Sequence, residues 1–119
     1  MSPALSALPL TPTVFHILLA LVDREKHGYA IMQEVEEHTG GRIRLGPGTL
    51  YGSLDRLLAA GFIEECAAPS KDSAFRERRR YYRLTTSGRV ALQQETHRLK
   101  SAVAHARRKG ILGGVKAGA

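Results

Sequence analysis

Five arginines lie within eight residues of this 119-residue chain, in the segment Arg76-Glu77-Arg78-Arg79-Arg80-Tyr81-Tyr82-Arg83. Guanidinium groups bind phosphate oxygens through paired hydrogen bonds, and each phosphate they neutralise releases counterions. The whole chain has 18 Lys and Arg against 11 Asp and Glu, a net charge of +7. This balance favours an anionic partner such as nucleic acid. The alternative interpretation is a solvated basic face that only keeps the protein in solution.

A helix predicted over residues 47–60 is the second candidate site. The turn sequence Gly46-Pro47-Gly48-Thr49 leads into it, and Gly61 ends it. Leucines recur at helical spacing and form one apolar face: Leu50, Leu54, Leu57 and Leu58. The opposite face is predicted to carry Thr49, Gly52, Ser53 and Arg56.

The polar face of this helix has groups suited to reading DNA. Small residues let a helix approach the major groove closely, and Thr49 can contact a thymine methyl group or a phosphate. Arg56 can donate two hydrogen bonds to guanine, whereas Asp55, which faces partly outward, would repel phosphate. Taken alone, the helix is equally consistent with an ordinary amphipathic core helix.

Two strands are predicted directly after this helix, over residues 62–66 and 76–84, with a loop over residues 67–75 between them. Side chains alternate along a strand, so Tyr82 and Leu84 are expected to face the core and Tyr81 the other side. The arginines nearest the hairpin tip are the predicted DNA-backbone or minor-groove contacts: Arg76, Arg78, Arg79 and Arg80. Such contacts position a protein and carry little sequence information.

Three more helices are predicted from apolar periodicity, over residues 11–22, 28–38 and 86–109. Thr11 is the expected N-cap of the first of these helices, and Thr85 is the expected N-cap of the last. The fold class is therefore mainly α with a small β-hairpin, a winged helix-turn-helix followed by a C-terminal dimerisation helix. The connectors are predicted as a charged turn over residues 23–27 and a strand-like stretch over residues 42–45.

The domain organisation follows from these elements. We expect a flexible N-terminal arm (residues 1–10), a winged helix-turn-helix domain (residues 11–85), a dimerisation helix (residues 86–109) and a disordered tail (residues 110–119). A helix of about 24 residues spans roughly 36 Å and overshoots a small domain, so its narrow apolar stripe favours pairing with a second subunit. The predicted interface residues are Phe15, Leu92, Leu99 and Val103. The alternative is that this stripe packs on its own domain.

Composition argues against several other classes. The single cysteine, Cys66, cannot form an intramolecular disulfide, and the five histidines show no ligand-like cluster, so no metal and no cofactor are expected. Catalytic signatures such as a phosphate loop or G-x-S-x-G are absent from the sequence, so an enzyme is not expected. No signal peptide or membrane-length apolar run is present, which predicts a cytoplasmic protein with no membrane partner.

Four segments, in order, resemble the PadR-like family of winged helix-turn-helix transcriptional regulators. They are His27-Gly28-Tyr29, then Gly48-Thr49-Leu50-Tyr51-x-x-Leu54-x-x-Leu57, then Gly61-Phe62-Ile63, then Arg80-Tyr81-Tyr82-Arg83-Leu84-Thr85-x-x-Gly88. The resemblance implies that Thr49 and Tyr51 contact DNA. It also implies that Tyr82, Leu84 and Gly88 are structural. Gly52 departs from the family, in which proline is frequent after the tyrosine.

The resemblance also implies a function for a short member with one C-terminal helix. Members of the family usually repress transcription as homodimers, and some are released by small phenolic or multidrug-type ligands. We therefore expect a homodimeric repressor that binds a pseudo-palindromic operator in double-stranded DNA, with a small hydrophobic or aromatic effector near Phe15, Leu92 and Leu99. The alternative is a basic module that binds RNA or a protein partner, for which Tyr81 is the one stacking candidate on the wing.

Overall fold

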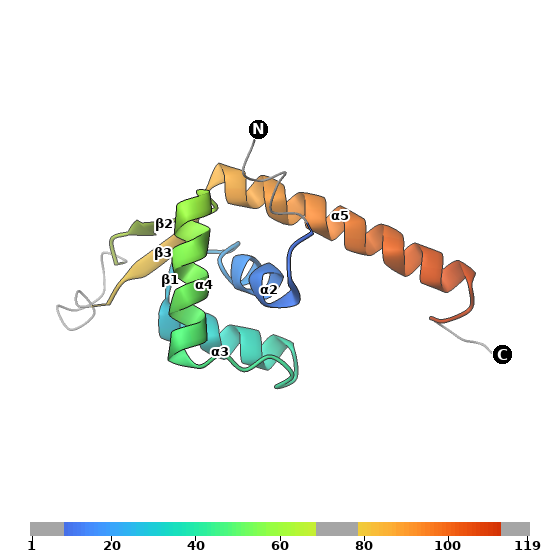
Figure 1. The fold of residues 1–119 in the computed structure, drawn as a ribbon, viewed down its shortest axis with the longest axis horizontal. Coiled ribbons are helices and arrows are strands. Elements are labelled where there is room, and N and C mark those ends of the chain that lie inside the picture. The colour runs from blue at the N-terminus through green and yellow to red at the C-terminus, as the bar shows by residue number, and fades with distance from the viewer. Residues whose placement is uncertain (1–8, 69–78, 113–119) are drawn as a thin grey trace.

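The computed structural model describes residues 9–68 and 79–112. Its elements, in chain order, are α2 (Pro12–Ala20), β1 (Lys26–His27), α3 (Gly28–His38), α4 (Pro47–Ala60), β2 (Ile63–Cys66), β3 (Tyr81–Leu84) and α5 (Thr86–Arg108). Helices α2, α3 and α4 form one body with the small sheet at its side, and α5 extends away from it (Figure 1). This order and content confirm the predicted fold class, a mainly helical winged helix-turn-helix.

Side-chain caps begin three of the helices. The Thr11 hydroxyl accepts a hydrogen bond from the Val14 N–H at 3.2 Å, and the Thr85 hydroxyl accepts one from the Gly88 N–H at 3.0 Å. At α3 the cap is His27, whose Nδ1 accepts from the Ala30 N–H. These bonds satisfy N–H groups that a helix start otherwise leaves without a partner. The two threonine caps were predicted, whereas the histidine cap was not.

The sheet has three antiparallel strands in the order β1-β3-β2. Tyr82 of β3 lies opposite Glu65 on one side and Lys26 on the other. The charged turn predicted over residues 23–27 is therefore wrong at its end, because Lys26 and His27 form the outer strand β1. The prediction failed because Lys26, a charged residue, is buried in this fold. Its ammonium group donates to the Ala20 carbonyl and to Asp23, each at 2.6 Å.

Two other strand predictions need correction. The second wing strand begins at Tyr81 rather than residue 76; Arg79 and Arg80 precede it, and residues 69–78 lie outside the described part of the chain. Residues 42–45 form no strand and connect α3 to α4 as irregular backbone. There, the Ile43 N–H donates to the Thr39 hydroxyl at 3.0 Å. The Thr39 hydroxyl thus satisfies a backbone N–H group that, in a strand, would need a hydrogen bond to a neighbouring strand.

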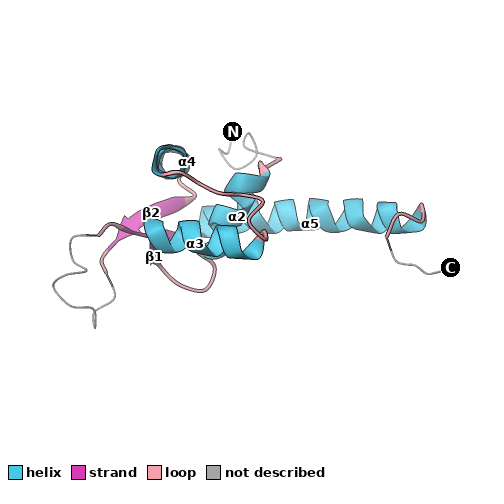
Figure 2. Ribbon diagram, turned by 90° about the horizontal axis from the view of Figure 1, so that it is seen from below, coloured by secondary structure: helices cyan, strands magenta, loops and turns pink. Residues whose placement is uncertain are grey.

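The core lies where the three short helices meet the sheet. Leu50, Leu54 and Leu57 of α4 pack into it with Ile17, Leu18, Ile31, Phe62 and Tyr82. Seen from below, α4 runs end-on above the layer formed by α2, α3 and the strands, so its other side faces outward (Figure 2). The leucine periodicity therefore fixes which side of α4 is available to a partner.

Helix α5 joins this core only through its first turns. Its buried residues are Gly88, Ala91, Leu92 and Glu95, and the helix then continues to Arg108. The carboxylate of Glu95 accepts a hydrogen bond from the Leu10 N–H at 3.2 Å and one from Arg98 Nε at 3.1 Å. Leu10 itself is buried, so the chain is anchored on α5 just before α2 begins. The predicted arm and tail otherwise lie outside the described residues over 1–8 and 113–119.

Candidate nucleic-acid interface

The outward face of α4 carries Thr49, Tyr51 and Arg56, all of them exposed, and Gly52, which is half-buried. The expectation that Ser53 shares this face is wrong, because Ser53 is only 2% exposed. Its hydroxyl accepts a hydrogen bond from Arg56 Nη2 at 3.3 Å. Ser53 therefore lies beneath the surface and orients the arginine, rather than meeting a partner itself.

The start of α4 is open. Gly46 is the N-cap and has no side chain to bond the N–H groups of the first turn, and Pro47 occupies the first helical position. A Cβ built on Gly46 or Gly48 would meet nothing within 4 Å. Backbone N–H groups at a helix start attract anions, and an unobstructed start lets a phosphate approach them.

Tyr51 lies against the start of α3. A Cβ at Gly28 would come within 2.5 Å of the Tyr51 hydroxyl oxygen, so only glycine leaves room for this ring. The Tyr51 side chain is 43% exposed. It lines an open hollow of about 520 Å³ together with His27, Tyr29, Arg79 and Arg80. The hollow joins three parts of the molecule: the start of α3, the outward face of α4 and the wing.

His27 and Tyr29 belong to this surface although they were not among the predicted site residues. Tyr29 is exposed, and the His27 ring lies 2.8 Å from Arg79 Nη1 through its Nε2 atom. The His27-Gly28-Tyr29 motif was the available signal, since it precedes the candidate reading helix. Nothing in its spacing shows that it lies beside the wing, because that contact depends on β1 pairing with β3.

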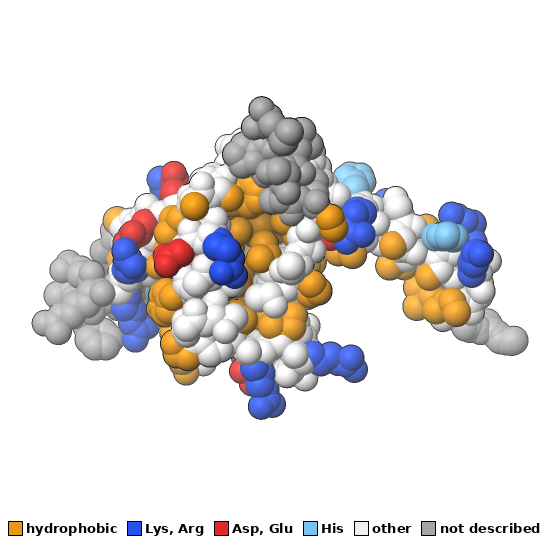
Figure 3. Space-filling view, viewed as in Figure 1, with side chains coloured by type: hydrophobic (Ala, Val, Ile, Leu, Met, Phe, Trp, Pro, Cys, Tyr) orange, Lys and Arg blue, Asp and Glu red, His pale blue; other side chains and the backbone are white. Residues whose placement is uncertain are grey.

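Two arginines of the wing, Arg80 and Arg83, lie beside acidic side chains. Arg80 Nε donates to Glu65 Oε2 at 3.1 Å, and Arg83 Nε donates to Glu64 Oε2 at 2.6 Å. The charge of Glu65 and its hydrogen bond raise the pKa of the Arg80 guanidinium. Figure 3 shows basic and acidic side chains mixed beside α4 on the side of the strands. The prediction of phosphate contacts from the number of arginines did not include these acidic partners. Arg76 and Arg78 lie outside the described residues.

Tyr81 does not have the predicted orientation. It is 3% exposed, and its ring meets the His27 ring edge-on with the centroids 5.4 Å apart. It therefore offers no face on which a base could stack, which removes the wing aromatic from the RNA alternative. The exposed aromatic rings of this surface are Tyr29 and Tyr51.

The four predicted dimerisation residues have different surroundings. Leu92 is 5% exposed and belongs to the core of its own chain, so its assignment to a subunit interface is corrected. Phe15 is half-buried and packs on the same core, and Leu99 is also half-buried. Val103 is exposed on the projecting part of α5. The apolar periodicity of α5 could not show at which residue the helix extends beyond the domain.

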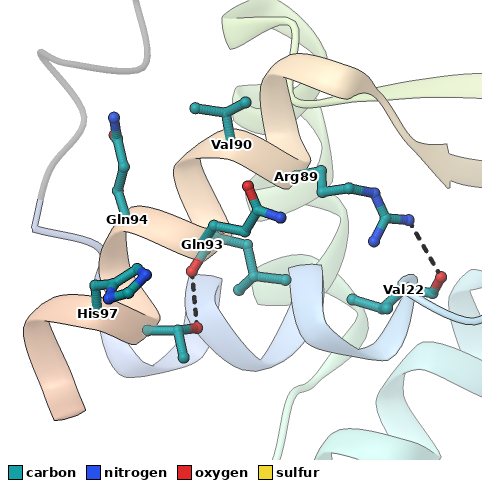
Figure 4. A pocket seen from close by; sticks show the side chains of 8 residues that line it. Val22, Arg89, Val90, Gln93, Gln94 and His97 are labelled. Carbon is teal, nitrogen blue, oxygen red and sulfur yellow. Dashed lines mark hydrogen bonds between the residues drawn. The ribbon is translucent and has the colours of Figure 1, made fainter.

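A second open hollow, of about 620 Å³, lies along the first half of α5. Val22, Val90 and Leu92 contribute apolar walls, and Gln93 and His97 contribute polar groups. Figure 4 shows these side chains around the opening, with Arg89 reaching the Val22 carbonyl, to which it donates at 3.4 Å. This hollow lies between α5 and Val22, which follows α2, apart from the surface around Tyr51. Leu92 lines it, whereas Phe15 and Leu99, which were expected near an effector, do not.

Other reactive groups in the described ranges do not form a site. Cys66 is half-buried, and burial raises the pKa of its thiol, which makes the reactive thiolate less available. Within residues 9–68 and 79–112, no group of three His, Cys, Asp or Glu side chains could hold a metal ion. In the same ranges, no helix is long and apolar enough to cross a membrane.

An α4 helix with a polar outward face, followed by a two-stranded wing, defines a winged helix-turn-helix protein. Residues 17–94 match the family described as "Transcriptional regulator PadR-like family". This match covers well over half of the chain, and the protein therefore belongs to the PadR-like family of transcriptional regulators. The family resemblance read from the four sequence motifs is confirmed.

Individual relatives agree with this assignment. The chain is 38% identical over 85 residues to "Transcriptional regulator Rv3488" of Mycobacterium tuberculosis, across 71% of this chain and 73% of the relative. It is 41% identical over 81 residues to "Uncharacterized 37.1 kDa protein in transposon TN4556" of Streptomyces fradiae, which covers 68% of this chain but spans only 21% of that protein. The structure of a PadR family transcription regulator from Clostridium difficile R20291 superposes with a TM-score of 0.70 at 23% identity. That superposition covers 82% of this chain and 97% of the other, and it shows the shared fold.

Proposed function

We propose that this regulator binds double-stranded DNA as a cytoplasmic homodimer and represses transcription from a pseudo-palindromic operator. The observation that carries the proposal is one continuous surface, in which the outward face of α4, the start of α3 and the wing meet around Tyr51. A reading helix in the major groove and a wing on the backbone need this arrangement. The family match supports DNA-binding regulation in general terms.

Within this surface we assign Arg56 to base recognition. Arg56 is exposed on the outward face of α4, and its guanidinium Nη2 donates a hydrogen bond to the Ser53 hydroxyl. Thr49 and Tyr51 are proposed to contact the sugar-phosphate backbone or a thymine methyl group, and half-buried Gly52 to let that backbone approach. Arg79 and Arg80 are proposed to contact phosphates, as are Arg76 and Arg78, which lie outside the described residues.

The homodimer is proposed from the projecting part of α5. Val103, Ile111 and Leu112 are exposed there, and hydrophobic side chains gather at this end of the helix among basic ones (Figure 3). A second copy that covers Leu99 and Val103 would remove this apolar surface from water. Two reading helices on one face of DNA should then sit about 34 Å apart, which predicts half-sites one helical turn apart.

The test compares two arginine-to-alanine variants of equal charge. Arg56→Ala should weaken binding to the native upstream DNA about tenfold and relax base preference at one position, because a bidentate guanine contact is lost. Arg24→Ala, at an exposed position in the turn between α2 and β1, is the matched control and should change affinity less than twofold. Electrophoretic mobility shifts at 150 mM salt measure both. If Arg56→Ala equals the control on every duplex, the assignment of α4 as reader is wrong.

A competition assay between duplex DNA and structured RNA distinguishes the proposed function from the alternative, a module that binds RNA. The proposed surface should prefer duplex DNA, since its helix face is suited to a major groove that A-form RNA makes too narrow. A preference for RNA, or no binding to either, would reject DNA repression as the function.

For the effector, we propose a small hydrophobic or aromatic molecule in the hollow between Val22 and the first half of α5. Its volume of about 620 Å³ is in the range of known ligand sites, and it combines valine walls with the polar groups of Gln93 and His97. Val90→Trp should fill the opening and abolish binding of phenolic test compounds in calorimetry. Binding that survives this substitution would place the effector elsewhere.

A further inference from the structure

The two arginine–glutamate pairs of the wing lie on opposite faces of the sheet. Glu65 lies opposite Tyr82 in the strand register, and Arg80 precedes Tyr82 by two residues, so all three share one face. Glu64 lies opposite Arg83 and shares the other face with it. The pairs have the same chemistry and similar exposure: 64% and 46% for Arg80 and Glu65, 58% and 50% for Arg83 and Glu64.

The first of these faces is the one that α4 covers. The electrostatic neighbours of Tyr82 are Tyr51 and Asp55 of α4, together with Arg80 and Glu65. Arg80 also lines the hollow that contains Tyr51. The neighbours of Arg83 are instead Glu64, Cys66 and Glu25. One ion pair therefore borders the proposed DNA surface, and its counterpart does not.

We infer that Glu65 is a positioning residue that lowers the affinity of this protein for DNA by occupying Arg80. The inference rests on the proposed function, and it concerns the strength of binding rather than base choice. A carboxylate 3.1 Å from the guanidinium cancels its charge locally and would lie within a few ångströms of any phosphate that Arg80 contacts. Binding DNA thus requires Arg80 to exchange one anionic partner for another, or a phosphate to approach a carboxylate.

This arrangement explains a sequence feature that the proposed function leaves aside. A wing that only had to bind phosphate would gain from a neutral residue at position 65, yet this residue is glutamate. Exposed ion pairs of this kind contribute little to stability, so the fold does not require them. Because phosphate contacts carry no sequence information, weakening one lowers the residence of the protein on all duplexes alike.

The experiment measures DNA affinity as a function of salt for Glu65→Gln and its matched control Glu64→Gln. Each substitution removes one negative charge and keeps the size of the side chain. Glu65→Gln should tighten binding to a random duplex about three- to fivefold at 50 mM salt and should steepen the slope of log affinity against log salt by about 0.9, one more phosphate neutralised. Glu64→Gln should leave the slope unchanged. A purely structural role of Glu65 would not alter this slope.

A second background tests whether Arg80 carries the effect. In the Arg80→Ala protein, adding Glu65→Gln should no longer steepen the slope, and thermal unfolding of all variants confirms that they are folded. The inference is overturned if Glu65→Gln binds as the parent or more weakly, or if the slope steepens equally without Arg80. If the parent itself binds no duplex while folded, the proposed function fails, which is a separate result.

Discussion

Helices α4 and α5 are both amphipathic, but their apolar faces have different coverage. The buried residues of α4 extend from Leu50 to Leu57, and the left-handed Gly61 ends the helix soon afterwards. Those of α5 lie between Gly88 and Glu95, and thirteen further residues, to Arg108, follow with none of them buried. Val103, in that second part, is 46% exposed. Helix α4 is buried against its own domain over most of its length, whereas α5 is buried against it for about a third of its length.

This difference teaches that an apolar stripe predicts burial, but it does not predict whether the same chain or a second chain covers the stripe. The stripe of α4 packs on the helices and strands that surround it in sequence, so one domain suffices. The stripe of α5 begins on its own domain at Leu92 and continues past the domain edge. The first part of α5 is therefore expected to govern folding, and the second part to govern assembly.

The largest expected effect comes from Gly88, where α5 begins to pack on the domain. A Cβ at this position would overlap the carbonyl oxygen of Phe62, a backbone atom that cannot move without disturbing β2. Gly88→Ala should lower the free energy of unfolding by about 3 kcal/mol or more, measured by urea denaturation. Ser87→Ala, at the exposed neighbouring position, is the control and should stay within about 0.5 kcal/mol of the parent. Equal stability of the two variants would contradict the packing of α5 described here.

The next effect separates the two parts of α5. Leu92→Ala removes a buried side chain from the core and should cost about 2–3 kcal/mol of unfolding free energy at any protein concentration. Val103→Ala removes an exposed side chain and should weaken self-association, so its unfolding midpoint should fall below that of the parent mainly at protein concentrations high enough for the parent to associate. Unfolding curves over a hundredfold concentration range distinguish these behaviours. A Val103→Ala midpoint that equals that of the parent at every concentration, in a parent whose midpoint depends on concentration, would place the interface elsewhere.

Much of the fold follows from local sequence signals. Proline, glycine and leucine spacing predicted α4 with its observed ends, and Thr85 predicted the start of α5. The strand β1 was not predictable in this way, since two residues have no periodicity and Lys26 is a charged residue that is buried. Its burial depends on the Ala20 carbonyl and on Asp23, partners that only the folded chain brings together.

The candidate site was predictable in outline but not in its electrostatics. Thr49 and Arg56 lie on the outward face as helical spacing predicts, and Tyr51, which the family resemblance assigned to DNA contact, is exposed there as well. Ser53 was misplaced because it lies at the edge between the two faces, where an angular projection cannot decide burial. The pairing of Arg80 with Glu65 depends on the register in which β2 and β3 pair, and side-chain alternation along one strand does not predict that register.

A smaller effect is expected where α5 meets the N-terminal side of the chain. Hydrogen bonds from Arg98 and from the Leu10 N–H lower the pKa of Glu95 below its usual 4.5, against the opposing effect of burial. A lowered pKa in the folded state means that the contribution of this carboxylate is complete above its unfolded pKa and is lost as pH falls through the folded value. Relative to Glu95→Gln, the parent should therefore be more stable at pH 6 and should lose that advantage as pH falls below 4.5 and through the lowered pKa of the folded state. Thermal midpoints across this range test it, and a constant difference would contradict the role of the charge.

The smallest expected effect concerns a glycine in the middle of α4. Gly52 has no strained backbone, and a Cβ there would meet only Arg56 Nη1, at an ordinary 3.8 Å. Since alanine favours a helix interior, Gly52→Ala should raise the free energy of unfolding by about 0.5–1 kcal/mol. The same methyl group would stand on the outward face between α4 and DNA, so affinity for the operator should fall although the protein is more stable. Ala59→Gly, an exposed change in the reverse direction near the end of α4, should lower stability and leave affinity unchanged. If Gly52→Ala gains stability without losing affinity, close approach at this position is not required, and the α4 surface is read through its longer side chains alone.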